Sequence, residues 1–455
     1  MQPNRNLLVR KLDPPQSWNP RVENYLRVTG FYHVSRIGMI RGSHPLLAAL
    51  VERWRPETHT FVLPVGEVTV TLEDVAHIFG LPIDGEPVSG WTDSSSDFVQ
   101  SHSMEIFGRQ PVLSHKSTAY AHAKYLPLLR DFERIHTYSW GSACLAHLYR
   151  ALCRASRYDT KEMDGPLNLL FVWAWERMPC ISPVPRHILP PAEIPVAMRW
   201  SHVERSTAWL EKTVVTFRVD IDYMQEFEWR PYQGMNIPVE LHRHLDVCDI
   251  VAPLLSFECI EWHPADRVMR QFGFLQPPPR APRDIPLEQH CMALRGVQLY
   301  DWTVLLGDWI AEWGNRRNTR MRDLHPLPTW DFIPTPEYRD WYVRSFGHLL
   351  RLSAYSLPER FTAARIDSCR SEIIPTPSFL TTCIRRFLRK KCHASAVSPS
   401  TKAKAIGTMF WFPSCATATR SVPLYFPYRC VPSTCTRGLQ CLNALTHGLK
   451  LQNTR

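Results

Sequence analysis

The sequence has little lysine and no long hydrophobic run. Of its 53 basic residues only 10 are lysine, against 43 arginines. The longest apolar run in the middle of the chain, Leu169 to Trp175, has seven residues, whereas a transmembrane helix needs about twenty. We therefore expect no membrane span. Met1 to Pro15 contains charges and prolines where a signal peptide needs an apolar stretch, so we expect an intracellular protein.

The chain does contain enough apolar material for a folded core. Hydrophobic residues make up 44% and aromatic residues 11% of its 455 residues, which predicts a globular protein. The 39 prolines and 19 glycines exclude collagen and coiled-coil compositions. The 13 cysteines are odd in number and have no repeating spacing. Without an export signal, we expect them to be reduced thiols.

The positive charge is concentrated at the C-terminal end. The net charge of the whole chain is +10. Residues 356–455 carry 15 Lys and Arg against 3 acidic residues, a net of +12, which leaves −2 for residues 1–355. We predict a folded domain at 1–355 and a basic, cysteine-containing, disordered extension at 356–455. Because the body is electrically balanced, the positive charge of the whole chain is only weak evidence for nucleic-acid binding.

The hydrophobic pattern of the body predicts mainly helices and one small β-hairpin. Segments with helical spacing are 45–54, 71–79, 140–156, 166–177, 206–217 and 298–313. Alternation in 59–63 and 67–70, around Pro64-Val65-Gly66, predicts the hairpin. The strands are too few for a parallel doubly wound sheet. The expected fold class is therefore a single large, mainly α-helical domain with a minor β component.

Several long segments resemble one known family. They are LVERWRPETHTFVLPVGEVTVTLEDVAHIFGLPIDGEPVSG at 50–90, WNPRVENYLRVTGFY at 18–32, WGSACLAHLYRALCRAS at 140–156, LLFVWAWERMP at 169–179 and EWHPADRVMRQFG at 261–273. Together they resemble the plant mobile ("aminotransferase-like") domain of the MAINTENANCE OF MERISTEMS family. The resemblance implies a plant nuclear protein linked to meristem maintenance, genome stability and transposon silencing. It also implies a type-seven phosphatase-like partner.

The sequence does not support the aminotransferase activity that the name "aminotransferase-like" suggests. A pyridoxal-phosphate enzyme needs a Schiff-base lysine beside a phosphate-binding turn. No lysine occurs between Lys212 and Lys390, and Lys124 and Lys212 are expected to be solvated on helices. Metallophosphatase, Walker A, nucleophile-elbow and kinase motifs are absent from the sequence. We therefore predict no catalytic activity and no cofactor.

Two groups of Cys and His residues are candidate zinc ligands. His242, His244, Cys248, Cys259 and His263 lie within 22 positions, and imidazole and thiolate are zinc ligands. In the extension, the set is Cys430, Cys435, Cys441 and His447. Neither spacing matches a common zinc module. The expectation is therefore ordinary packing and no metal.

Two further elements are candidate functional sites. One is a partner-docking block made of Trp54, Glu57, Thr58, His59 and Asp84. The alternative for this segment is that Trp54, Phe61 and Leu63 form core while Thr71 and Asp74 cap a helix. The other is a basic cluster, Arg385, Arg386, Arg389, Lys390 and Lys391, which nuclear import receptors could bind, although a chance basic run explains it as well.

Three hypotheses for function follow. The first is a non-catalytic nuclear protein-interaction module. The second is a transposon-derived nucleic-acid-binding protein, supported by the arginine bias and the basic extension. The third is an enzyme of unrecognised type with His59 and Asp84 as its polar pair.

Overall fold

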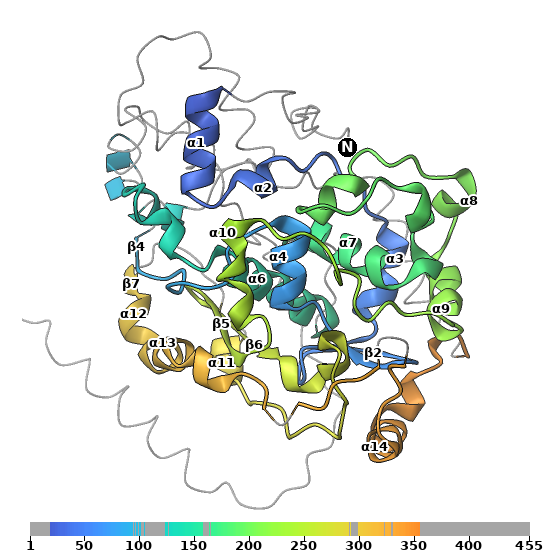
Figure 1. Cartoon of the computed structure of the whole chain (residues 1–455). Coiled ribbons are helices and arrows are strands. Elements are labelled where there is room, and N and C mark those ends of the chain that lie inside the picture. The colour runs from blue at the N-terminus through green and yellow to red at the C-terminus, as the bar shows by residue number, and fades with distance from the viewer. Residues whose placement is uncertain are drawn as a thin grey trace, which may run out of the picture. The chain divides into compact units, whose positions relative to one another are not determined.

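The computed structural model describes residues 19–354, apart from 94, 96, 99, 102–103, 105–122, 126, 158–162, 164, 291, 293–298, 323 and 329–330. Helices account for about half of the described residues, and three small antiparallel sheets lie among them (Figure 1). Most buried apolar side chains belong to one continuous cluster. Among the described helices, none combines the length and the apolar character needed to cross a bilayer.

The helices are α1 (Pro20–Val28), α2 (Tyr32–Ser35), α3 (His44–Val51), α4 (Leu72–Phe79), α6 (Trp140–Arg157), α7 (Leu167–Arg177), α8 (Thr207–Leu210), α9 (Val214–Asp222), α10 (Val239–His242), α11 (Leu287–His290), α12 (Trp302–Leu305), α13 (Gly307–Gly314) and α14 (Pro336–Phe346). The strands are β1 (Trp54–Arg55), β2 (Thr60–Leu63), β3 (Gly66–Val68), β4 (Trp91–Asp93), β5 (Val251–Ser256), β6 (Cys259–Pro264) and β7 (Leu299–Asp301). The sheets have the orders β1-β2-β3, β4-β7 and β5-β6.

The helices with the strongest sequence signals form as predicted. At the start of α4, the Thr71 hydroxyl accepts a hydrogen bond from Asp74 N, and the Asp74 carboxylate accepts one from Thr71 N, which completes the capping box. Gly80 ends the helix with φ 64°, a left-handed conformation that favours glycine. Helices α6 and α7 occupy the predicted 140–156 and 166–177, and α4 packs against both.

The predicted hairpin is present as β2 and β3, and β1 extends it to three strands. The predicted position of Trp54 in this region is wrong. The helical pattern of 45–54 predicts Trp54 at the end of a helix, but α3 ends at Val51, and Trp54 pairs with Phe61 across β1 and β2. The aromatic side chain therefore enters the core from a strand, where its ring contacts Phe61 at a centroid distance of 4.8 Å.

Two other predicted helices are broken. Residues 206–217 divide into α8 and α9 because the Thr213 side chain accepts a hydrogen bond from Thr216 N and starts a new helix. Residues 298–313 divide into β7, α12 and α13 because 299–301 pair with β4. Local periodicity could not reveal a partner strand about 200 positions earlier in the chain.

The β5–β6 hairpin was not predicted at all. Its register runs from Val251 opposite Pro264 to Ser256 opposite Cys259, with Phe257 at φ 50° in the turn. Nearly every residue of both strands is buried, and the hairpin packs against α6. A strand buried on both faces lacks the polar and apolar alternation that identifies a half-exposed strand. The fold is thus mainly helical, with more sheet than the sequence predicted.

Candidate functional site

Among the described residues, a group of His, Cys and Glu side chains is buried around the carboxylate of Glu261, on β6. Its Oε2 accepts hydrogen bonds from His59 Nε2 at 2.7 Å and from His290 Nε2 at 2.8 Å. The Cys153 thiol lies 3.7 Å from the same oxygen, and Arg150 Nε contacts Oε1 at 2.5 Å. We call His59, Cys153, Glu261 and His290 the buried cluster.

Four separate elements bring the buried cluster together. His59 lies between β1 and β2 with φ 52°, a conformation that is uncommon for residues other than glycine and often marks a functional position. Cys153 lies on the last turns of α6, one turn after Arg150, and His290 is the last residue of α11. The β5–β6 hairpin carries Glu261 to all of them.

The surroundings of the buried cluster fix its protonation. Burial by itself raises the pKa of Glu261, but the nearby Arg150 guanidinium and the His290 and His59 hydrogen bonds outweigh this effect and hold the pKa well below its usual range. Burial lowers the pKa of His59 and raises that of Cys153 well above its usual value. The ground state is therefore a carboxylate with a neutral imidazole and a thiol beside it.

Outer contacts hold these side chains in place. Trp54 Nε1 donates to Cys153 Sγ at 3.3 Å, and the Tyr149 ring stacks on His59 with centroids 5.5 Å apart. Arg157 Nη1 lies 3.0 Å from His290 Nδ1. Because arginine can only donate, His290 Nδ1 accepts and its proton is on Nε2.

The buried cluster is closed to substrates in this conformation. None of its four side chains is more than 5% exposed. A nucleophilic cysteine must be reachable and must form a thiolate, whereas Cys153 is enclosed and protonated. The arrangement suits a structural hydrogen-bond network or a small bound cation better than turnover of an organic substrate.

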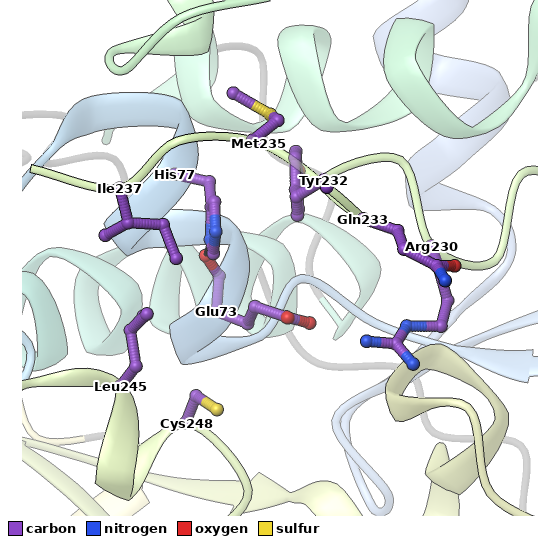
Figure 2. Close-up of a pocket in the computed structure, with 10 residues that line it drawn as sticks. Glu73, His77, Arg230, Tyr232, Gln233, Met235, Ile237, Leu245 and Cys248 are labelled. Carbon is purple, nitrogen blue, oxygen red and sulfur yellow. Dashed lines mark hydrogen bonds between the residues drawn. The ribbon is translucent and has the colours of Figure 1, made fainter. Parts of the chain in front are cut away.

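A pocket of about 210 Å³ opens beside α4 (Figure 2). It is lined by Glu73, His77, Arg230, Tyr232, Gln233, Gly234, Met235, Ile237, Leu245 and Cys248. The His77 and Tyr232 rings stack at 4.6 Å with an interplanar angle of 8°. Burial, with a smaller contribution from Asp74, raises the pKa of Glu73 to about 7. The pocket can receive a small polar group between an acid and an arginine.

The predicted docking block does not form one surface. Trp54, Thr58 and His59 are buried, and His59 belongs to the buried cluster. Glu57 is exposed. Asp84 is mostly covered and binds Arg316 at 2.5 Å and also Arg317. His59 and Asp84 therefore have different partners, and the structure does not join them as an acid–base pair.

The Cys and His residues of 242–263 that were candidate zinc ligands do not converge. The two imidazole nitrogens of His263 contact Ile250 O and Leu72 N. His244 Nδ1 accepts from Asp84 N, and His242 Nε2 contacts Ile237 O. Cys259 Sγ lies 3.4 Å from Ala146 O. Each of these four side chains contacts a different part of the backbone.

The two candidate cofactor lysines form ion pairs. Lys124 Nζ lies 2.7 Å from Glu258 Oε2, and Lys212 Nζ lies 2.8 Å from Asp220 Oδ2. The expectation that Lys124 is solvated is wrong, because its side chain is only 3% exposed. The basic cluster at 385–391 and the cysteines of the extension lie outside the described residues.

Sequence reasoning missed three members of the buried cluster: Cys153, Glu261 and His290. They lie on segments without a common spacing, and His59 and Glu261 are 202 positions apart. The only local signal was the presence of His, Cys and Glu in otherwise apolar segments, which does not specify partners.

Comparison with known proteins gives relatives in Arabidopsis thaliana. "Serine/threonine-protein phosphatase 7 long form homolog" is 34% identical over 406 residues, covering 75% of this chain and 30% of the relative. "Protein MAIN-LIKE 1" is 31% identical, covering 70% of each chain. "Protein MAINTENANCE OF MERISTEMS" is 28% identical, covering 54% of this chain and 60% of the relative.

The chain therefore spans less than a third of the phosphatase 7 long form homolog and a larger part of the other two relatives. No solved structure matches it. The family model described as "Plant mobile domain" matches residues 30–110 and 106–343, most of the described body. The resemblance seen in the sequence is thus confirmed, and the chain belongs to the plant mobile domain family.

Proposed function

We propose that this protein is a non-catalytic nuclear interaction module that acts in meristem maintenance, genome stability and transposon silencing. Support for the meristem role comes from the relatives whose names contain MAINTENANCE OF MERISTEMS or MAIN-LIKE. Support for a phosphatase-like partner comes from the relative named as a phosphatase 7 long form homolog. Nuclear import would use the basic cluster at 385–391.

The observation that carries the interaction role is an apolar edge on the surface. Five large hydrophobic side chains on β4, β7 and α12 are at least 42% exposed: Trp91, Leu299, Tyr300, Val304 and Leu305. The strands pair directly, with Trp91 opposite Asp301 and Asp93 opposite Leu299, and α12 contacts both strands. Exposed apolar side chains gathered in one place are typical of a protein-binding surface.

The chemistry of the described residues favours binding over catalysis. Lys124 and Lys212, the lysines among the described residues, are both paired with carboxylates. The buried cluster is inaccessible to substrates. An aromatic and aliphatic surface patch is therefore the feature best placed to meet another macromolecule.

The excess of arginine over lysine has an explanation inside the fold. Buried or half-buried ion pairs join Arg53 to Asp222, Arg150 to Glu261, Arg177 to Asp74, Arg199 to Glu176, Arg218 to Glu52 and Arg267 to Glu67. The planar guanidinium suits such buried pairing. The arginine bias therefore gives little support to the nucleic-acid hypothesis.

The test is capture of a type-seven phosphatase-like protein by the full chain and by a double variant of the apolar edge, Val304→Asp with Leu305→Asp. We expect the double variant to lose at least tenfold in captured phosphatase while keeping its unfolding temperature. Val239→Asp is the matched control, because Val239 is 80% exposed on α10, outside the edge. Equal capture by all three proteins would refute the proposed surface.

A further inference from the structure

We propose that the buried cluster is a structural zinc site with His59 Nε2, His290 Nε2, Cys153 Sγ and a Glu261 carboxylate oxygen as its ligands. These four ligand atoms lie within 4.8 Å of one another, and all four residues are buried. Imidazole, thiolate and carboxylate are the zinc ligands of proteins, and four of them complete a closed structural site. This inference is independent of the proposed interaction role.

The three ligand-atom separations that involve Glu261 Oε2 differ by at most about 0.7 Å from those of a tetrahedral zinc site. Two ligands about 2.1 Å from a tetrahedral ion lie roughly 3.4 Å apart, and a sulfur and an oxygen ligand roughly 3.6 Å apart. The Cys153 Sγ to Glu261 Oε2 distance is 3.7 Å. The two nitrogen to oxygen distances are 2.7 and 2.8 Å. Each imidazole nitrogen must therefore move about 0.6 to 0.7 Å farther from Glu261 Oε2 to admit the ion.

The neighbours of the ligands support this assignment. Arg150 holds the other carboxylate oxygen of Glu261, and Trp54 Nε1 donates to the Cys153 sulfur. Outer contacts of this kind orient ligands and stabilise a thiolate. When the ion binds, the Cys153 thiol loses its proton to solvent. The proton on each imidazole moves from Nε2 to Nδ1, so that Nε2 can bind the metal.

The contact between Arg157 and His290 opposes binding of the ion. Its guanidinium donates to His290 Nδ1, whereas a metal-bound His290 would carry a proton on that nitrogen. Arg157 is an exposed residue at the end of α6. Substituting Gln for Arg157 replaces an obligate donor with a side chain that can accept the Nδ1 proton.

The experiment measures zinc in the full chain purified without added metal, followed by titration of the metal-depleted chain with Zn²⁺ and with Co²⁺. We expect one equivalent more zinc in the wild type than in Cys153→Ser. We also expect a Co²⁺ spectrum with tetrahedral bands and a sulfur charge-transfer band that Cys153→Ser removes. Cys144→Ser is the matched control, since Cys144 is a buried cysteine on the same helix and outside the buried cluster.

Arg157→Gln provides a test that does not depend on a core substitution. We expect it to tighten Zn²⁺ binding roughly tenfold, the lower end of the effect of outer-shell contacts on metal affinity. Cysteines elsewhere in the chain could also bind metal, but neither Cys153→Ser nor Arg157→Gln would change the amount of metal bound there. The proposal is overturned if wild type, Cys153→Ser and Arg157→Gln have the same zinc content, the same Co²⁺ spectrum and the same Zn²⁺ affinity. The buried cluster would then be a hydrogen-bond network without a metal.

Discussion

Arg177, at the C-terminal end of α7, and Asp74, in the first turn of α4, form a fully enclosed ion pair. The Arg177 Nη2 to Asp74 Oδ1 distance is 2.7 Å, and neither side chain has exposed surface. The Tyr232 hydroxyl donates to the same oxygen at 2.8 Å. Asp74 also completes the capping box of α4. One carboxylate therefore links the start of a helix to a second helix and to the pocket wall.

Loss of this ion pair should destabilise the fold strongly. Arg177→Met leaves the Asp74 carboxylate buried without a cation, and we expect a loss of about 3 to 5 kcal/mol in the free energy of unfolding. Arg134→Met is the control, because Arg134 pairs with Glu86 on the surface and should cost less than about 1 kcal/mol. Urea denaturation of both variants measures the difference. Similar losses would contradict the prediction.

Glu73 should make stability depend on pH. Its pKa is about 7 in the folded chain, above its ordinary value of 4.5, so the folded state binds the proton more tightly than the unfolded state. Stability therefore falls as pH rises from 4.5 toward 7. We expect Glu73→Gln to raise the free energy of unfolding by about 1 kcal/mol at pH 8 and to change it little at pH 5. Unfolding curves at the two pH values test this, and an equal effect at both would count against it.

Gly80 should not accept a side chain. It ends α4 with φ 64°, and a Cβ there would lie 2.3 Å from His33 Cβ. We expect Gly80→Ala to lower the free energy of unfolding by about 2 kcal/mol, from strain and from the clash. Gly307→Ala is the comparison, because a Cβ at that helical position meets nothing within 4 Å. Gly307→Ala should leave the free energy of unfolding unchanged or raise it slightly. Thermal unfolding of both variants tests this difference.

Pyridoxal phosphate should not form an internal aldimine with this chain. The candidate Lys124 is enclosed and paired with Glu258, and Lys212 is paired with Asp220. We expect protein incubated with pyridoxal phosphate to show no aldimine absorbance and no lysine adduct after borohydride reduction. A borohydride-trapped adduct at either lysine would contradict this prediction and support an aminotransferase-like activity.

The basic extension should be dispensable for folding of the body. Residues 356–455 carry a net charge of +12 and have a sparse apolar pattern, which cannot offset a chain entropy of about 1 to 2 kcal/mol per ordered residue. We expect limited proteolysis to leave a stable fragment that ends within about twenty residues of Ser356. If a chain ending at 355 is insoluble or unfolds several degrees lower, the boundary is wrong. Its nuclear accumulation would show that import does not need Arg385 to Lys391.

Local sequence patterns were enough to predict the family, the helices α6, α7 and α4, and the β2–β3 hairpin. Each of these depends on residues a few positions apart, such as Thr71 and Asp74, so the signal is contained in a short window. Tertiary structure decided the rest. Trp54 joined a strand, and the fully buried β5–β6 hairpin formed where no alternation was visible. Glu261 lies beside His59, Cys153 and His290 because buried polar groups need hydrogen-bond partners inside the protein. These partners are far apart in the sequence, so no local pattern identifies them.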